Sequence, residues 1–344
     1  MKIIEVIADP GHHDTIVAIA EQQQVEDIWS TSNNEDGRII TRLLVHPENR
    51  QKVLDALQTV LHNAENYHVL ILPLDTALPK PAKVDFESLS AEQQEEEKEK
   101  EKQRKKAATM NTREEILAQV EKDAQLDNNF ILLIILSAIV AAIGLLENNL
   151  AVIVGAMVIA PLLGPNIAFS LGASLGEKKL VIESLKVMFT GITLAIVIAV
   201  GIGLLWQGDF DSMELMLRTD VTYSGTAIAL ASGAAASLSL VTSASSVLVG
   251  VMVAVALMPP AVTIGLMLSI GQYDHAIGAA LLLAVNIVCI NLSSKLVFLF
   301  RGIHPRNWVE ARKAKQSRLL YIMIWIVMLL LLIVIIYLRH RTQT

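Results

Sequence analysis

The sequence has little of what enzymes and metal proteins are usually built from. It contains one cysteine, Cys289, which excludes an intrachain disulfide and any metal site made of several cysteines. No third ligand at a suitable spacing accompanies His12 and His13, and the Walker and Rossmann glycine patterns are missing. We therefore expect no enzyme, no cofactor and no metal site, and we expect Cys289 to be a small buried hydrophobic residue.

The chain also lacks an excess of basic residues. Its 28 lysines and arginines are outnumbered by 34 aspartates and glutamates, which gives a formal net charge of −6 at pH 7. A nucleic-acid-binding surface needs a concentrated basic patch, so we expect no nucleic-acid partner. No charged segment followed by a short apolar segment opens the chain, so we also expect no cleavable signal peptide and an N-terminal part in the cytoplasm.

Long uncharged runs are abundant instead. The chain of 344 residues is 53% hydrophobic and 18% charged, and its mean hydropathy is +0.50, which is typical of a membrane protein. The sequence up to Asn129 is of the ordinary soluble kind, whereas the apolar runs from Phe130 onward approach the roughly 20 residues that cross ~30 Å of hydrocarbon. We predict about seven spans, at Phe130–Leu146, Leu150–Leu175, Val181–Trp206, Tyr223–Val241, Val247–Ile270, Ala276–Phe300 and Leu319–Leu338.

Residues 1–80 predict a small soluble α+β domain. Its apolar periodicities give strands at Lys2–Ala8, Val25–Ser30, Arg38–His46 and Tyr67–Leu74 and helices at Asp14–Gln24 and Asn49–Asn63. The order βαββαβ is that of the ferredoxin-like sandwich, in which two helices cover one face of a four-stranded antiparallel sheet. By analogy of fold alone, we expect this domain to sense a ligand or to form a homo-oligomer.

Residues 81–126 predict a linker that leads into the membrane. Most residues from Glu87 to Lys106 are Glu, Gln, Lys or Arg, which is typical of a solvated helical spacer or of disorder. Thr112-Arg-Glu-Glu115 then has the form of a capping box and predicts a helix at the membrane surface. Residues 127–344 form the predicted polytopic α-helical membrane domain.

Charged loops orient the predicted spans. Basic residues gather at Lys178–Lys186 and Arg301–Arg318. Apart from Arg218, the loops on the other side of the membrane carry acidic residues: Glu147, Asp209, Asp211, Glu214, Asp220 and Asp274. The positive-inside rule then places the N-terminal domain and both basic loops in the cytoplasm. We therefore expect a multi-pass protein of the cytoplasmic (inner) membrane, with the lipid bilayer as its immediate partner.

One apolar motif occurs twice, 95 residues apart. The alignment pairs Gly155 with Gly250, Met157 with Met252, Leu162 with Leu257, Pro165 with Pro260, and Gly176 with Gly271. Because Gly, Met and Pro match in one register, the sequence indicates an internal repeat. Each copy occupies the middle span of a three-span group, and an odd number of spans makes the second group enter from the opposite side. The prediction is a 3+3 inverted repeat plus a final helix.

Each copy of the motif carries prolines near the middle of its span. Proline lacks an N–H and clashes with the carbonyl four residues back, so that carbonyl has no hydrogen-bond donor within the helix. The carbonyls affected in this way are those of Met157, Pro161, Val255 and Ala256. Paired broken helices are a sequence indication of a transport site. The freed carbonyls could coordinate a cation or water, and a half-helix starting at Asn166 could face an anion. In the alternative, the prolines only kink packed helices.

Polar side chains within the predicted spans are few. Asn286 is nearest to mid-depth, and it either lines a polar path or makes an ordinary interhelical hydrogen bond. No Asp or Glu at membrane depth offers a proton relay. The candidate residues for binding a substrate or ion are Met157, Pro161, Gly164, Pro165, Asn166, Val255, Ala256, Pro259, Pro260, Asn286 and Asn291.

Three runs carry a family resemblance: Asn149–Pro165, Ala254–Pro260 and Gly278–Asn286. Together they resemble the prokaryotic membrane proteins filed as domain of unknown function 389, over roughly Phe130 to Phe300. Members of that family often carry a small soluble domain before the membrane part. The resemblance implies the architecture predicted above and names no substrate.

Two functions from different classes fit these features. The first is a transporter or channel for an unknown small solute or ion, regulated or oligomerised by its cytoplasmic domain. The second is a membrane-anchored scaffold or ligand sensor without transport activity. Water at the middle of the membrane separates the two, because a transporter needs it and a packed anchor does not.

Overall fold

Two units make up the structure, a computed structural model that describes residues 2–32, 37–62, 64, 66–74, 112–242, 257–303, 323 and 325–336. The first unit extends from Met1 to Arg113 and the second from Glu114 to Thr344. The two repeat residues Val255 and Ala256, and the charged run Glu87–Lys106, lie outside the described residues.

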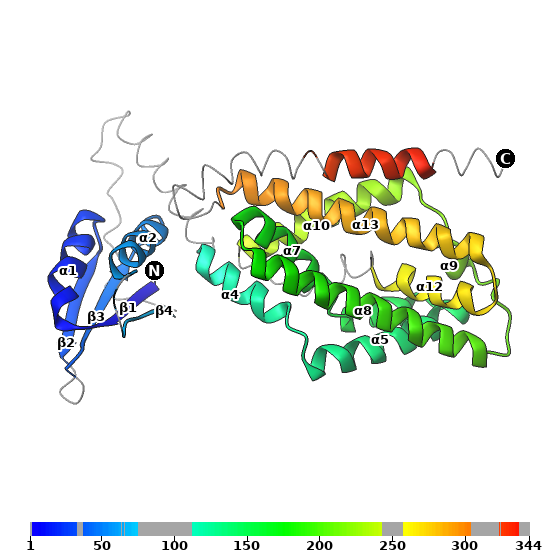
Figure 1. Cartoon of the computed structure of the whole chain (residues 1–344), viewed down its shortest axis with the longest axis horizontal. Helices are drawn as coiled ribbons and strands as arrows, with labels where there is room; N and C mark the ends of the chain where they lie inside the picture. The colour runs from blue at the N-terminus through cyan, green and yellow to red at the C-terminus, as the bar shows by residue number, and fades with distance from the viewer. Residues whose placement is uncertain are drawn as a thin grey trace, which may run out of the picture. The chain divides into compact units, whose positions relative to one another are not determined.

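The first unit has the predicted element order βαββαβ (Figure 1). Its elements are β1 (Lys2–Ala8), a 3-10 turn (Pro10–His12), α1 (His13–Gln22), β2 (Asp27–Ser32), β3 (Ile39–Val45), α2 (Arg50–Leu61) and β4 (His68–Pro73). The strands form one antiparallel sheet in the order β2-β3-β1-β4, so the two outer strands are the second and the fourth. This is the split βαβ topology that the sequence predicts.

Side-chain alternation along the strands divides the sheet into two faces. Ile4, Val6 and Ala8 of β1 point to one face, where they join buried residues of β3, α1 and α2 in a single core. Both helices therefore cover the same face. The opposite face carries no helix of this unit, and its residues are considered further below.

The second unit is helical, and several of its helices are apolar enough to cross a membrane. Its elements are α4 (Arg113–Asp123), α5 (Asn128–Leu146), α6 (Leu150–Ile159), α7 (Leu163–Leu175), α8 (Lys178–Leu205), α9 (Met213–Met216), α10 (Tyr223–Val241), α12 (Met258–Ser269), α13 (Tyr273–Phe300) and a helix at Trp325–Ile336. Within the described residues, α5, α8, α10 and α13 are long and apolar enough to span, and α6 with α7 forms a bent pair. These helices indicate a membrane protein.

Five of the seven predicted spans coincide with described apolar helices. Four of them coincide with α5, α8, α10 and α13, and the fifth coincides with the pair α6–α7. The remaining two are described only in part, as the shorter helices α12 and Trp325–Ile336. Residues 247–256 of the first of these, and residues 319–322, 324, 337 and 338 of the second, lie outside the described residues.

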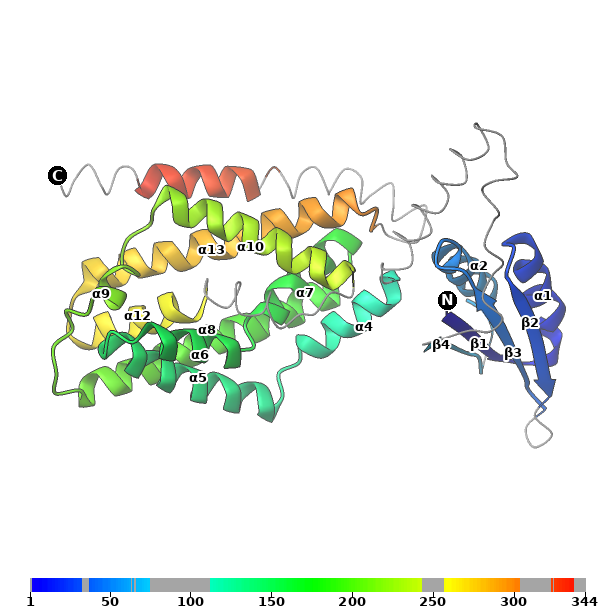
Figure 2. The same cartoon turned by 180° about the vertical axis from the view of Figure 1, so that it is seen from behind.

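Packing in the second unit centres on α8 and α13, the two longest helices (Figure 2). Helix α8 contacts α5, α7 and α12, and α13 contacts α7, α10 and α12. Close approach depends on glycine at one crossing. A Cβ at Gly265 of α12 would lie 2.4 Å from the carbonyl oxygen of Ile196 and 2.6 Å from the Cβ of Ala199, both in α8.

This contact predicts the effect of adding one methyl group. Gly265→Ala has to push α12 away from α8, and overpacking of this kind costs about 1–3 kcal/mol. Gly201→Ala, in α8, is the matched control, because no heavy atom lies within 4 Å of its added Cβ. Thermal unfolding in detergent should therefore show a lowered Tm for Gly265→Ala alone. Equal Tm values for the two variants would contradict the described crossing.

Candidate functional site

A break between α6 and α7 is the most irregular feature of the described membrane helices. Helix α6 ends at Ile159, α7 begins at Leu163, and their axes differ by 50°. Ala160 is extended, with φ −68° and ψ 116°. This conformation follows from the next residue, Pro161, because proline disfavours the helical conformation of the residue before it.

The start of α7 corrects one prediction. The sequence predicted a half-helix that begins at Asn166, after Pro165, but the helix begins at Leu163. Pro165 is accommodated in the first turn of α7, where its missing N–H would have no helical partner in any case. Pro259 and Pro260 occupy the same place in α12, whose first residue is Met258.

Gly164, in the first turn of α7, is held against the end of α4. A Cβ at this position would lie 2.5 Å from the carbonyl oxygen of Asp123 and 2.8 Å from its Cβ. Burial raises the pKa of the Asp123 carboxyl, and the positive charge of the neighbouring Lys122 partly offsets the increase. The predicted site residue Gly164 is therefore a packing contact between α4 and the first turn of α7.

A cluster of buried polar side chains lies where α7 crosses α13. Asn291 of α13 donates through Nδ2 to Oδ1 of Asn166 and, at 2.9 Å, to the carbonyl oxygen of Ile287. The Ser170 hydroxyl donates to the Asn291 carbonyl oxygen at 2.9 Å or to its Oδ1 at 3.0 Å. Asn166, Ser170 and Asn291 have no exposed surface. We call these three residues the α7–α13 cluster.

Helix α10 adds a second buried hydrogen bond next to this cluster. The Ser237 hydroxyl donates to Oγ of Ser294 at 2.7 Å, and both serines are fully buried. Ser294 is three residues after Asn291 on α13, so the two polar contacts lie on neighbouring parts of the same helix. Polar contacts thus connect α13 to both α7 and α10.

Lys295 is one helical turn beyond Asn291 and is 5% exposed. Its Nζ lies 5.9 Å from the ring centroid of Phe169 in α7 and 5.2 Å from that of Trp325 in the C-terminal helix. The two rings meet edge to face, with centroids 5.9 Å apart. A cation over aromatic faces is attracted by their quadrupoles, so the three side chains join α7, α13 and the C-terminal helix.

Two buried polar atoms, one in α7 and one in α12, have no protein hydrogen-bond partner among the described residues. They are Nδ2 of Asn166, in the second turn of α7, and Oγ1 of Thr263, in the second turn of α12. Both residues have no exposed surface. Buried polar groups are nearly always hydrogen-bonded, so each atom requires a partner that is not a protein side chain or backbone group of this part of the chain.

The structure brings some of the predicted site residues together. Asn166 and Asn291, 125 positions apart, are in contact, and Pro161, Gly164 and Pro165 lie within the break or the first turn after it. The other described candidates are buried but outside the cluster: Met157 in α6, Pro259 and Pro260 in α12, and Asn286 near the middle of α13. Val255 and Ala256 are outside the described residues.

Several residues of this region are not among the predicted candidates: Ser170, Ser237, Ser294, Lys295 and Thr263. Helical spacing is the sequence signal for two of them. Ser170 lies four residues after Asn166, and Lys295 lies four residues after Asn291, so each shares a helix face with a predicted candidate.

Enzyme and metal motifs can be checked within the described residues. Gly172-Ala-Ser-Leu-Gly176 has the Gly-x-Ser-x-Gly spacing of hydrolase nucleophiles. Here the run forms the last turn of α7 rather than a turn from strand to helix, and the Ser174 hydroxyl donates to the Ser170 carbonyl at 2.8 Å. No group of three His, Cys, Asp or Glu side chains is placed to hold a metal in the part of the chain that the structure describes.

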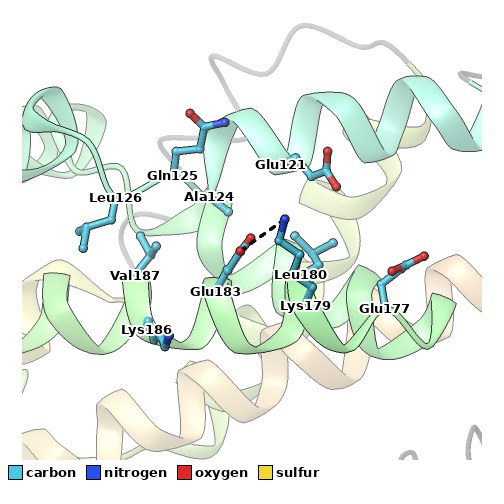
Figure 3. A pocket seen from close by; sticks show the side chains of 10 residues that line it. All are labelled: Glu121, Ala124, Gln125, Leu126, Glu177, Lys179, Leu180, Glu183, Lys186 and Val187. Carbon is cyan, nitrogen blue, oxygen red and sulfur yellow. Dashed lines mark ion pairs between the residues drawn. The ribbon is translucent and has the colours of Figure 1, made fainter. Parts of the chain in front are cut away.

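A cavity of about 570 Å³ lies between the end of α4 and the start of α8 (Figure 3). Glu183 of α8 points toward α4, and its carboxylate lies 3.9 Å from Nζ of Lys179. Glu121 of α4 and Glu177 before α8 also line the cavity, so its charges are mixed. None of its lining residues belongs to the α7–α13 cluster, and the cavity is a separate feature of the helix ends.

The α7–α13 cluster predicts coupled effects on stability. Removing either amide of the Asn166–Asn291 pair leaves the other without its partner, so Asn166→Ala and Asn291→Ala should be non-additive by about 1 kcal/mol. Ser184→Ala is the control, since the Ser184 hydroxyl bonds only within α8 among the described contacts. Double-mutant cycles of thermal unfolding measure the coupling energy of the Asn166–Asn291 pair and that of each asparagine with the Ser184 control, which should be near zero. Additive effects for the Asn pair would show that the contact carries no energy.

Comparisons with known proteins agree with the resemblance seen in the sequence. The model of a family described as "Domain of unknown function (DUF389)" matches residues 157–292, which include α7, α8, α10, α12 and most of α13. An uncharacterized protein of Methanocaldococcus jannaschii is 30% identical over 302 residues, which cover 88% of this chain and 88% of that protein. No solved structure matches the chain. The chain therefore belongs to the family of the domain of unknown function 389.

Proposed function

We propose that this protein is a transporter or channel of the cytoplasmic (inner) membrane, for a small solute or ion that binds at the broken helices. One observation carries the proposal. Each of the two helices that carries proline in its first turn holds a fully buried polar atom without a protein partner among the described residues, Asn166 Nδ2 in α7 and Thr263 Oγ1 in α12. Water or a bound solute would satisfy both atoms, and a dry packed anchor would leave them unsatisfied in hydrocarbon.

Helix boundaries support an inverted repeat around these half-helices. Helix α10 begins and ends 95 residues after α5, and α13 begins and ends 95 residues after α8. The caps follow the same spacing: Asp127 accepts a hydrogen bond from the Phe130 N–H at the start of α5, and Thr222 accepts one from the Gly225 N–H at the start of α10. The offset is that of the Gly155–Gly250 alignment.

Chain reversals also agree with this repeat. Gly176 follows α7 with φ +80°, and Gly271 follows α12 with φ +72°. A left-handed conformation at a helix end favours glycine, which explains why this residue type is present in both copies. Figure 1 shows α8 and α13 running in opposite directions, and α7 and α12 running toward opposite ends of the helical unit. Opposed directions are what an inverted repeat requires.

Helix contacts follow the repeat as well. The α5–α8 contact corresponds to α10–α13, the α7–α8 contact to α12–α13, and the α8–α12 contact to α13–α7, and all six pairs are in contact. The half-helix of each copy therefore packs against the long helix of both copies. This arrangement places α7 and α12 at the interface between the halves, where transporters with inverted repeats bind their substrates.

The two crossings differ in polarity, which selects one of them as the site. The repeat pairs Ser170 with Gly265 and Ile196 with Asn291, each 95 residues apart. The contact of Ser170 with Asn291 at the α7–α13 crossing therefore corresponds to the contact of Gly265 with Ile196 at the α12–α8 crossing. The first position is a hydrogen-bonded serine–asparagine contact, whereas the second is a backbone contact that leaves no room for a Cβ at Gly265. We therefore place the binding site at the α7–α13 cluster.

The first unit has its own place in this proposal. Its sheet and helices form an independent core, and α4 follows it in the chain and contacts the break at Gly164. A cytoplasmic domain of this kind can regulate the membrane part or bring copies together. No catalytic chemistry enters the proposal.

Access of water to the broken helices tests the proposal directly. In a Cys289→Ser background, single cysteines replace Asn166, Ala261 and Asn286, and a small impermeant thiol reagent is added to oriented membranes from either side. Transport predicts that at least Asn166→Cys reacts, because this position belongs to the α7–α13 cluster. Ala195→Cys is the control, since Ala195 of α8 is equally buried and is not a residue of the cluster.

The opposite result favours the second candidate function. If the three cysteines remain as unreactive as Ala195→Cys, while cysteines at the exposed positions Glu177 and Asp209 react, the broken helices are dry packing. The protein would then be a membrane-anchored scaffold or sensor, and the transport proposal would be wrong.

A further inference from the structure

The uncovered face of the N-terminal sheet is apolar around one central ion pair. Residues that alternate with the core positions point to this face, and the strand registers arrange them in three rows across β2, β3, β1 and β4. The rows are Asp27, Leu44, Ile3, Leu72; then Trp29, Arg42, Glu5, Leu70; then Thr31, Ile40, Ile7, His68. We call these twelve residues the open face.

Large apolar side chains remain accessible on the open face. Trp29 is 37% exposed, Leu70 is 42% exposed and Leu72 is 40% exposed, and the isoleucines of the central strands are half-buried. An apolar patch of this extent on a soluble domain usually marks an interaction surface. The chemistry of its centre indicates which partner fits.

Glu5 and Arg42 form the middle of the face. They are directly opposite each other in the register of β1 and β3, and Nε of Arg42 lies 2.5 Å from a carboxylate oxygen of Glu5. The Glu5 side chain is only 12% exposed, whereas that of Arg42 is 35% exposed. An apolar partner or a lipid tail would remove this remaining exposure, chiefly that of Arg42, and offer the pair no polar contact, which is unfavourable. A suitable partner has to present opposite charges at the same two points.

A second copy of the chain meets this requirement. We propose that two copies pair through their open faces, related by a twofold axis that runs parallel to the strands between β1 and β3. This axis places the partner's Glu5 over Arg42 and the partner's Arg42 over Glu5. It also places Trp29 over the partner's Leu70 and Leu44 over the partner's Ile3. A twofold axis perpendicular to the strands would instead place Glu5 over Glu5, so the charges select the first arrangement.

The size of the face sets the strength of the pairing. Four strands about 4.8 Å apart and six or seven residues long, at about 3.3 Å per residue, give an area of roughly 400 Å² per copy. Stable protein interfaces bury about 800 Å² per partner, so the open face alone makes a weak dimer. Two chains confined to one membrane meet at a high effective concentration, which strengthens the pairing without further contacts. The inference concerns the other unit and does not rest on the transport site.

Cross-linking of the full-length chain tests the arrangement. In a Cys289→Ser background, a single cysteine at Leu44 lies near the proposed axis, and a short bismaleimide should join two copies into a covalent dimer. Leu70→Asp, on the open face, should abolish that dimer. Val60→Asp is the matched control, because Val60 is 40% exposed on α2, in the helix layer on the other side of the sheet.

Charge exchange tests the central contact. Glu5→Arg and Arg42→Glu should each lose the cross-linked dimer, since the facing centres then carry like charges. Co-expression of these two chains with different tags should restore it as a mixed dimer, because one centre is then positive and the other negative. The double variant Glu5→Arg/Arg42→Glu keeps the ion pair within each copy and the ion pairs between the copies, so it should cross-link like the parent. This result would show that the domain accepts the exchanged charges.

Three outcomes would overturn the proposed interface. One is the absence of a cross-linked dimer in the Leu44→Cys parent. Another is equal loss of the dimer in Leu70→Asp and Val60→Asp. The third is failure of the two oppositely charged chains to form a mixed dimer while the double variant cross-links normally.

Discussion

A backbone polar group buried in hydrocarbon needs a partner inside the protein, and this constraint governs the membrane unit. A continuous helix meets it automatically, but the chain between Ile159 and Leu163 does not form one. The break persists because other elements pack around it. Asp123 of α4 closes against Gly164 on one side, and the hydrogen bonds of Asn291 reach Asn166 and Ser170 on the other.

The need to satisfy buried polar groups also separates the α12–α8 crossing from the α7–α13 crossing. At the α12–α8 crossing, Gly265 allows the backbone of α12 to lie directly against that of α8 at Ile196. At the α7–α13 crossing, side-chain amides and a hydroxyl occupy the interface, and Asn166 retains one buried donor without a protein partner among the described residues. This difference is the basis for proposing the α7–α13 crossing as the place that receives a polar ligand. Lys295, with Phe169 and Trp325 around it, adds a positive charge close to the α7–α13 crossing.

Much of this architecture could be predicted from the sequence, because it follows from short-range patterns. Alternation and 3.6-residue periodicity gave all six main elements of the N-terminal unit, and apolar length gave the long helices. The start of α7 was predicted three residues late, because Pro165 was treated as a helix breaker although the first turn of a helix tolerates proline. Asn166 and Asn291 were identified as candidates, but their contact spans 125 positions and cannot be derived from local spacing. Ser170 and Lys295 were missed for the same reason, since their roles depend on the helix that crosses them.

We propose that the two halves of the membrane unit are inverted copies. Glu177 and Gln272 test it most directly, because they are 95 residues apart, immediately precede α8 and α13, and are both exposed. Single cysteines at these positions, in a Cys289→Ser background, can be labelled with an impermeant maleimide in intact cells and in inside-out vesicles. An inverted repeat predicts that Gln272→Cys is labelled from outside the cell and Glu177→Cys only from the cytoplasmic side. Labelling of both cysteines from the same side would contradict the inverted repeat and the transport site built on it.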